Sequence, residues 1–137
     1  KKTLIIRTNF YGKSKSINRK SFSDHIISNL KKKNKMRLPE NIFFNPVHLD
    51  FLNTIILKLI KKKITGIFNL GSKDYISKYD FGLSIAKKFN LDKKNIIKYK
   101  SVYNKNNRPL NTFMNTNKLI KKISIKMPLI QDGIELL

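Results

Sequence analysis

The chain has 137 residues, no cysteine and a formal net charge of +22. This length allows one domain with a buried core, and the absence of cysteine excludes a disulfide framework, a thiolate metal site and a cysteine nucleophile. A composition of 40% apolar and 10% aromatic residues is typical of a globular protein and argues against wholesale disorder.

Short apolar runs alternate with longer amphipathic segments along the chain. The pattern predicts, in chain order, a strand at 3–8, a helix at 21–35, a strand at 43–49 interrupted by a proline, a helix at 49–63, a strand at 66–72, a helix at 76–90, a strand at 95–102, a loop at 103–118 and short helices at 117–122 and 131–137. Strands that alternate with helices indicate an α/β domain with parallel pairing.

The strand expected at 3–8 is apolar on both of its faces. Such a strand normally lies inside a sheet that is covered on both sides, and the few strands of this chain would cover it poorly. We therefore expect residues 1–137 to be one portion of a larger fold. Residues 1–12 would form the last strand region of a sheet whose other strands lie outside this sequence.

The three longer helices carry start and stop signals. The expected N-caps are Ser21, Ser23 or Asp24 for the first helix, Asp50 for the second, and Ser77, in capping-box spacing with Asp80, for the third. Each of these helices ends in a cluster of lysines, where cations oppose the helix dipole.

The positive charge alone would also fit a basic nucleic-acid-binding module. However, lysine, asparagine and isoleucine, which AT-rich codons favour, make up 62 of the 137 residues, and arginine occurs only four times. Arginine is the better residue for bidentate phosphate recognition. We therefore attribute the charge to composition and solvated helix ends, and expect no nucleic-acid partner. No apolar run is long enough to cross a bilayer and no signal peptide opens the chain, so we expect a cytoplasmic protein with no membrane contact.

No arrangement of residues indicates a catalytic or metal centre. Tyr11 and Lys15 have the Tyr-x-x-x-Lys spacing of short-chain dehydrogenases, but Gly12 follows the tyrosine and favours a turn over the helix that such a pair needs. The two histidines, His25 and His48, have no carboxylate at metal-ligand spacing. The expected catalytic and metal residues in this chain are therefore none.

Five segments, in order, carry a resemblance to a known family: LIIRTNFYG (4–12), FFNPVHLDFLNTIILKLI (43–60), GIFNLGSKDYISKYDFGLSIAKKF (66–89), RPLNTFMNTNKL (108–119) and IKMPLIQDGIELL (125–137). The series resembles the C-terminal, substrate-binding half of extended short-chain dehydrogenase/reductases that act on nucleotide sugars. It is most similar to dTDP-4-dehydrorhamnose reductases among the NAD-dependent epimerase/dehydratases. The resemblance implies the C-terminal part of a Rossmann-like fold, with a small mixed sheet and flanking helices.

The resemblance also implies roles for particular residues. It places Thr8 and Asn9 beside the nicotinamide cofactor, and Asn9 also near the substrate, although Asn9 could instead only cap a turn. It places Arg108, with Asn111 close by, at the diphosphate of the nucleotide sugar, for which the guanidinium fork is well shaped. Asn111 could alternatively be a turn residue. Many epimerases carry a further phosphate-binding arginine where this chain has Phe44.

The function implied by the resemblance is the binding of a nucleotide-sugar substrate in an NAD(P)-dependent oxidoreductase that reduces a 4-keto sugar for polysaccharide precursor synthesis. The glycine loop and the catalytic residues of such enzymes lie in the N-terminal half, so we expect this chain alone to bind no NADP or NAD and to be inactive. An epimerase or dehydratase and a non-catalytic regulatory homologue are the alternatives within the superfamily. The resemblance also leaves a homodimer of the intact enzyme open.

Overall fold

The computed structural model describes residues 2–16, 18–102 and 109–137. The described helices are α1 (Phe22–Lys31), α2 (Leu49–Lys61), α3 (Lys78–Lys88), the 3-10 helix η1 (Lys93–Asn95), α4 (Asn117–Ile123) and α5 (Ile130–Ile134). The described strands are β1 (Leu4–Thr8), β2 (Phe10–Tyr11), β3 (Met36–Pro39), β4 (Phe43–Phe44), β5 (Val47–His48), β6 (Gly66–Leu70), β7 (Ile76–Ser77) and β8 (Ile96–Tyr99).

These strands pair two by two. The pairs β1–β6, β2–β5 and β3–β8 are parallel, and the pair β4–β7 is antiparallel. The expected mixed α/β fold with small sheets and flanking helices is therefore confirmed. Pro46 divides the expected strand at 43–49 into β4 and β5, because proline has no N–H to donate to a ladder. The sequence pattern did not predict β2, β3 or β7.

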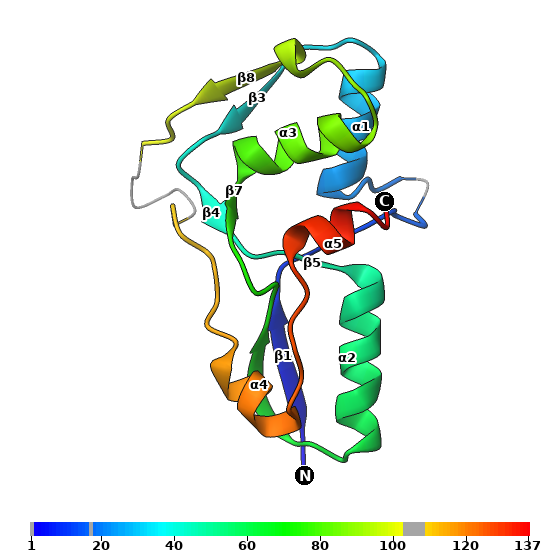
Figure 1. Ribbon diagram of the computed structural model, residues 1–137, viewed down its shortest axis with the longest axis vertical. Coiled ribbons are helices and arrows are strands. Elements are labelled where there is room, and N and C mark those ends of the chain that lie inside the picture. Colours follow the sequence, from blue (N-terminus) through cyan, green and yellow to red (C-terminus); the bar gives the residue numbers. More distant parts are fainter. Residues whose placement is uncertain (1, 17, 103–108) are drawn as a thin grey trace.

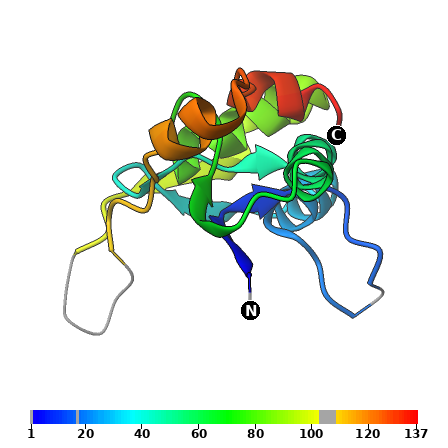
Figure 2. The ribbon, with the colours of Figure 1, turned by 90° about the horizontal axis from the view of Figure 1, so that it is seen from below.

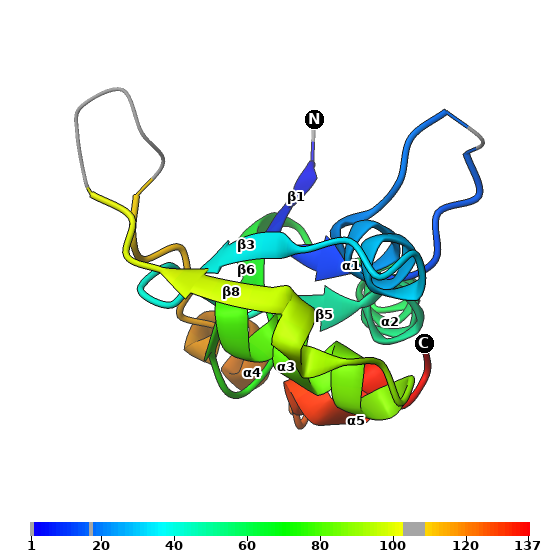
Figure 3. The same cartoon turned by 90° about the horizontal axis from the view of Figure 1, so that it is seen from above.

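The buried side chains form two clusters, which divide the molecule into two lobes (Figure 1). The lower lobe contains β1, β6, α2 and α4 around Leu59, Phe68 and Leu119. The upper lobe contains α1, α3, α5, β3 and β8 around Phe81 and Ile85. Figure 3 shows β3 and β8 side by side, with α3 beneath them. The chain passes between the lobes where β4 gives way to β5, since Phe44 belongs to the upper cluster and Val47 to the lower one.

In the lower lobe, only one face of the β1–β6 pair is covered within the described part of the chain. Ile6 and Phe68 pair across the strands and pack on the lower cluster, which α2 and α4 complete. Ile5 and Ile67, which pair on the opposite face, are 47% and 45% exposed. Figure 2 shows α3, α4 and α5 gathered on one side of the strands, away from the N-terminal end of the chain. Strand β1 has no described partner on its second edge. The expected continuation of the sheet stays a prediction.

The helix caps follow the sequence with one exception. Ser21 caps α1 in a capping box with Asp24, and Ser77 caps α3 by accepting the N–H of Asp80 at 3.0 Å. The expected N-cap Asp50 is wrong, because α2 begins at Leu49 and its N-cap is His48, two residues before Asp50. The Nδ1 of His48 accepts the N–H of Asp50 at 3.3 Å, so an imidazole replaces the short oxygen side chain that usually does this.

Candidate functional site

Hydrogen bonds join the carboxyl end of β1 to the segment 109–116, although the two lie about a hundred residues apart in the sequence. Asn9 Nδ2 donates to the carbonyl oxygen of Thr112 at 3.1 Å, and the Asn9 carbonyl accepts the N–H of Val47 at 2.9 Å. Half-buried Thr8 directs its hydroxyl to the Asn9 carbonyl at 3.3 Å. The donor end of the Asn9 carboxamide therefore holds two parts of the chain together. The contacts of Thr8 and Asn9 with a cofactor, and of Asn9 with a substrate, stay predictions.

The segment 109–116 is itself fixed against β4. Phe43 N donates to Leu110 O at 2.8 Å, and Thr112 donates both its N–H and its hydroxyl to Phe43 O, at 2.9 and 3.1 Å. Asn111 is exposed, and its Oδ1 accepts the N–H of Phe113 at 3.2 Å, which is the turn geometry that the residue type favours. Its role in substrate binding stays a prediction. Arg108 lies outside the described residues.

A pocket of about 450 Å³ opens where these segments meet. Aromatic and aliphatic side chains form most of its wall, and Asn9, Lys78 and Thr112 add polar groups. We refer to it as the aromatic pocket; its lining is Asn9, Phe10, Tyr11, Phe22, Ile42, Phe44, Lys78, Pro109 and Thr112. Apolar walls with a few polar groups are typical of small-molecule sites. Pro109, the first residue of the described segment 109–137, is part of the pocket lining. It follows Arg108 in the sequence.

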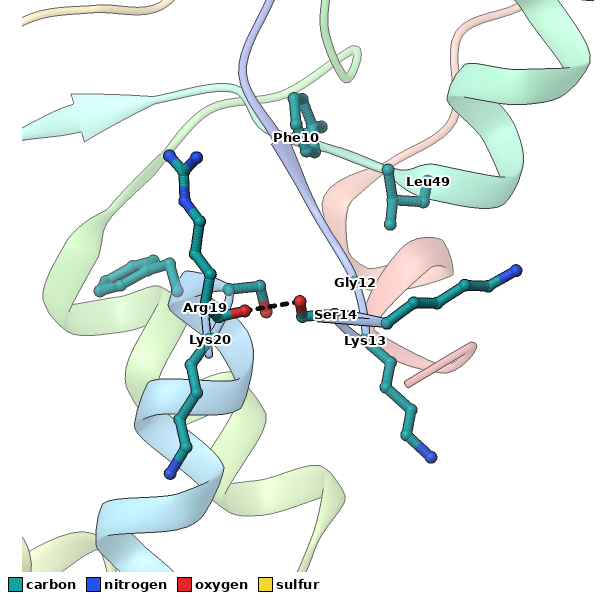
Figure 4. A pocket seen from close by; sticks show the side chains of 10 residues that line it. Phe10, Gly12, Lys13, Ser14, Arg19, Lys20 and Leu49 are labelled. Carbon is teal, nitrogen blue, oxygen red and sulfur yellow. Dashed lines mark hydrogen bonds between the residues drawn. The ribbon is translucent and has the colours of Figure 1, made fainter. Parts of the chain in front are cut away.

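A second pocket, of about 550 Å³, lies between β2, the start of α1 and the start of α2 (Figure 4). We refer to it as the cationic pocket; its lining is Phe10, Gly12, Lys13, Ser14, Lys15, Arg19, Lys20, Ser21, Phe22 and Leu49. Figure 4 shows Lys13 leaving the segment after β2, and Arg19 and Lys20 leaving the segment before α1. Phe10 and Phe22 line both pockets, so the two adjoin.

The cationic pocket was not predicted from the sequence. Its signal is present in the sequence as four basic residues between positions 13 and 20, one of them, Arg19, among the four arginines of the chain. The lysine-rich composition hid this signal, because short lysine clusters occur at every long helix end as well. Only the fold shows that these four residues line one concave surface.

Tyr11 and Lys15 do not form the catalytic pair that their spacing suggests. Tyr11 lies in β2, is buried, and donates its hydroxyl to the carbonyl oxygen of Ile130 at 2.8 Å. Burial, together with the charges of Asp74 and Asp132, raises the pKa of Tyr11. Lys15 is exposed outside any helix. A tyrosine that acts as a proton donor needs a lowered pKa, so this tyrosine is structural.

His48 also serves the fold. It is buried, packs edge-to-face on Tyr11 with ring centroids 5.4 Å apart, and caps α2. Burial lowers the pKa of His48, against the raising effect of the Asp50 carboxylate, so the imidazole is held neutral with Nδ1 free to accept. His48 therefore packs and hydrogen-bonds locally.

None of the helices among the described residues is long and apolar enough to cross a membrane. No group of three or more histidine, aspartate or glutamate side chains in the same part of the chain could hold a metal ion.

Comparison with known proteins decides the family. The sequence matches the RmlD substrate binding domain over residues 1–137. The chain belongs to this family. No curated protein matches the chain.

Solved structures share the fold of this RmlD substrate binding domain. Two are dTDP-4-dehydrorhamnose reductases: one from Bacillus anthracis in complex with NADP (TM-score 0.85, 22% identity, 97% of this chain and 47% of that chain) and one from Clostridium acetobutylicum (TM-score 0.81, 20% identity, 97% and 46%). A third is dTDP-glucose 4,6-dehydratase from Bacillus anthracis in complex with NAD (TM-score 0.73, 14% identity, 97% and 42%). The chain thus spans less than half the length of these proteins, and at these identities the likeness shows the fold, that of Rossmann-like reductases and dehydratases.

In the described part of the chain, none of the three longer helices begins at a glycine-rich turn. A dinucleotide cradle presents free backbone N–H groups from a glycine-rich turn at a helix N-terminus. Here the N-termini of α1, α2 and α3 are closed by the side chains of Ser21, His48 and Ser77.

The packing of Phe44 shows why position 44, where many epimerases carry an arginine, suits an aromatic side chain in this chain. Its side chain is 8% exposed and packs edge-to-face on Phe81, with ring centroids 5.3 Å apart, and on Phe22 at 6.3 Å. This position is part of the upper core and could not hold a charged guanidinium without a large desolvation cost.

Proposed function

We propose that this chain is the substrate-binding part of an NAD(P)-dependent oxidoreductase that reduces a 4-keto nucleotide sugar, most similar to dTDP-4-dehydrorhamnose reductase. The match to the RmlD substrate binding domain over the whole chain is the observation that carries this proposal. The adjoining pockets support it, because a nucleotide sugar combines an aromatic base and a sugar with a dianionic diphosphate. An aromatic pocket beside a cationic one offers surfaces of both kinds.

In this proposal the chain binds and orients the substrate. When bound in the intact enzyme, the nicotinamide cofactor supplies the hydride. The aromatic pocket excludes water from the sugar nucleotide, and Asn9 holds the rim at Thr112 in place through its hydrogen bond. Residues that polarise the ketone or deliver a proton belong to the part of the enzyme outside this sequence.

Arg108 is the proposed partner of the diphosphate. In the full-length parent protein, we expect Arg108→Ala to weaken the binding of a dTDP-sugar about tenfold or more, because hydrogen bonds to a charged group each contribute about 1.5–3 kcal/mol. Isothermal titration calorimetry measures this affinity directly. The matched control is Arg37→Ala, since Arg37 is an exposed arginine on β3 whose guanidinium stacks over Tyr99 at 5.2 Å, outside both pockets.

Equal affinity in Arg108→Ala and in the parent would refute the role of Arg108. The same preparation separates the reactions within the superfamily, because epimerases and dehydratases retain NAD between turnovers while a reductase exchanges it. Tightly bound NAD after purification would therefore favour an epimerase or a dehydratase over the reductase. DNA or RNA affinity that falls steeply with salt would favour the nucleic-acid-binding module instead.

A further inference from the structure

The upper lobe contains two units of the same kind, each a helix followed by a strand. Helix α1 leads into β3, and helix α3 leads through η1 into β8. Strands β3 and β8 are parallel, with Met36 opposite Ile96, and α1 packs on α3. Because parallel strands begin at the same edge of a sheet, the two connections from helix to strand lie side by side at one end of the molecule (Figure 1, Figure 3).

Lysines fill both of these connections. We refer to the last residue of α1 together with the lysines of the two connections as the basic end; its members are Lys31, Lys32, Lys33, Lys35, Lys93 and Lys94, all of them exposed. Backbone hydrogen bonds fix both turns, since Asn34 N donates to Asn29 O at 3.0 Å and Leu91 N donates to Ala86 O at 2.8 Å. The lysines therefore project from turns of fixed shape.

The positive charge of the basic end is not neutralised by paired acids. Asp92 is the one acidic residue in the two connections, and its Oδ1 accepts the N–H of Lys94 at 2.9 Å. The ion pairs found among the described residues include no lysine of the basic end. Six lysines thus lie beside a single carboxylate.

The residue types in the basic end favour a broad anionic surface as its partner. Arginine, which binds single phosphates in a bidentate manner, is absent from both connections. Neither connection has an exposed large apolar or aromatic side chain on which a nucleic-acid base could stack. Several separate ammonium groups at the end of the molecule instead suit a lipid surface, which presents many anionic headgroups.

The basic end lies apart from the pockets and from the open side of the sheet. Helix α1 begins at the pockets with Phe22 and reaches Lys31 after 10 residues, which separates the two places by about 15 Å. The exposed face of the β1–β6 pair and the unpaired edge of β1 belong to the lower lobe. A membrane at the basic end would therefore leave the pockets open.

We propose that the basic end binds the surface of an anionic lipid membrane, to which the protein attaches peripherally and reversibly. Since no exposed apolar side chain accompanies these lysines, the attraction is electrostatic and falls as salt rises. The expectation of no membrane contact rested on the lack of a spanning segment, which a peripheral surface does not need. The proposal is independent of the reductase function, because membrane binding requires no turnover.

Sedimentation with lipid vesicles tests the proposal on the full-length parent protein. The vesicles contain phosphatidylcholine alone or phosphatidylcholine with an equal share of phosphatidylglycerol, and we expect binding to the anionic vesicles only. A lysine near an anionic surface contributes about fivefold in affinity, so Lys32→Gln/Lys35→Gln/Lys94→Gln should bind about a hundredfold more weakly.

The matched control is Lys61→Gln/Lys62→Gln/Lys121→Gln, which removes the same charge from exposed lysines of the lower lobe. It should bind the anionic vesicles as the parent does, and circular dichroism checks that both variants fold. Equal binding of the parent to neutral vesicles, an equal loss in the control, or no binding of the parent to anionic vesicles would overturn the proposal. So would tighter binding of a DNA duplex through the same lysines, which would make the basic end a nucleic-acid surface.

Acetylation of lysines, followed by mass spectrometry, locates the contact on the unaltered parent. With anionic vesicles present, we expect Lys32, Lys35 and Lys94 to react severalfold more slowly, whereas Lys61 and Lys121 react at an unchanged rate. An equal slowing at both sets of lysines would show that the net charge of +22, and not the basic end, attracts the protein to the membrane, and would overturn the proposal.

Discussion

Gly133 lies in α5 where this short helix crosses Tyr11 and His48. A Cβ atom on Gly133 would collide with the Tyr11 hydroxyl and would lie 2.7 Å from His48 Cβ. Both neighbours are buried, and each is held by its own hydrogen bond, so neither can move aside cheaply. The absence of a side chain at 133 is therefore what lets the end of the chain pack on the strand pair β2–β5.

From this contact we predict that Gly133→Ala destabilises the protein by about 1–3 kcal/mol, the usual cost of overpacking a core. The better helix propensity of alanine, about 1 kcal/mol, is too small to offset the collision. Chemical denaturation of the full-length parent measures the change. The double variant Gly133→Ala/Tyr11→Phe, which removes the hydroxyl, should recover part of the loss relative to Tyr11→Phe alone. Two independent, additive effects would contradict the collision.

Asn9 shows how a candidate site residue can be proposed from the sequence while its hydrogen-bond partner cannot. The type and position of the residue favour either a turn or a ligand contact. In a turn its partner would be a neighbour in sequence, and in a ligand contact it would be the bound molecule. The observed donor bond goes instead to Thr112, 103 positions away. No local pattern carries such a partner, because it depends on where the chain returns after the whole upper lobe has been built.

The helix ends are the elements that local chemistry predicts best. The C-termini of α1, α2 and α3 share one arrangement, in which the residue after the C-cap has positive φ and two backbone bonds close the last turn. The residues with positive φ are Lys33, Lys63 and Asn90. In α2, for example, Lys63 N donates to Ile60 O at 2.9 Å and Ile64 N to Leu59 O at 3.0 Å. This is the Schellman arrangement, which usually uses glycine. Lysines near these ends also face the negative pole of the helix dipole.

At the helix starts we predict a difference between two serines of α3. Ser77→Ala should destabilise the protein by about 1–2 kcal/mol, because the fully buried Ser77 hydroxyl accepts the Asp80 N–H and donates to its carboxylate at 2.6 Å. Ser84→Ala is the control. Ser84 is less buried, and its hydroxyl donates to the Asp80 carbonyl inside the same helix. Alanine has a higher helix propensity than serine, so this variant should lose little stability. Thermal unfolding measures the stability of both variants. An equal loss of stability in the two would contradict the capping role of Ser77.

The same scale shows where prediction from pattern fails. Strands β2 and β7, which the pattern did not predict, have two residues each, which is too short for any hydrophobic period to appear. The helix N-cap His48 was missed because histidine rarely caps, and Asp50, the residue type that usually does, stands two positions later. For β2 and β7 the deciding partners, β5 and β4, are brought in by the fold.

At the scale of the whole molecule, two lobes meet at the carboxyl end of β1, and the two pockets lie beside that junction. The lower lobe exposes Ile5 and Ile67 on the face of its parallel strand pair. Parallel pairs are usually covered on both faces, and the related solved structures are more than twice as long as this chain. The exposed face therefore supports the proposal that this chain works together with a cofactor-binding part.

We therefore predict that residues 1–137 alone do not oxidise NADPH in the presence of a 4-keto sugar nucleotide, whereas the full-length parent does. The sequence shows neither a glycine-rich dinucleotide motif nor an acid/base pair, so we expect this chain alone to bind a substrate without reducing it. A spectrophotometric assay of NADPH at equal concentrations of the two proteins measures this, with circular dichroism to show that the shorter chain is folded. Turnover above background by residues 1–137 would contradict the prediction.

The sequence by itself determined the features that depend on neighbouring residues: the alternation of strands and helices, the caps at Ser21 and Ser77, the lysine-rich helix ends and the ordered segments that mark the family. The tertiary structure alone decided which of these residues meet. It closed Phe44 into the core, joined Asn9 to Thr112, and gathered Lys13 and Arg19 around one pocket. The physical reason is the distance along the chain over which each interaction acts. Propensity and capping act within one helical turn, while a pocket is made by segments that only packing brings together.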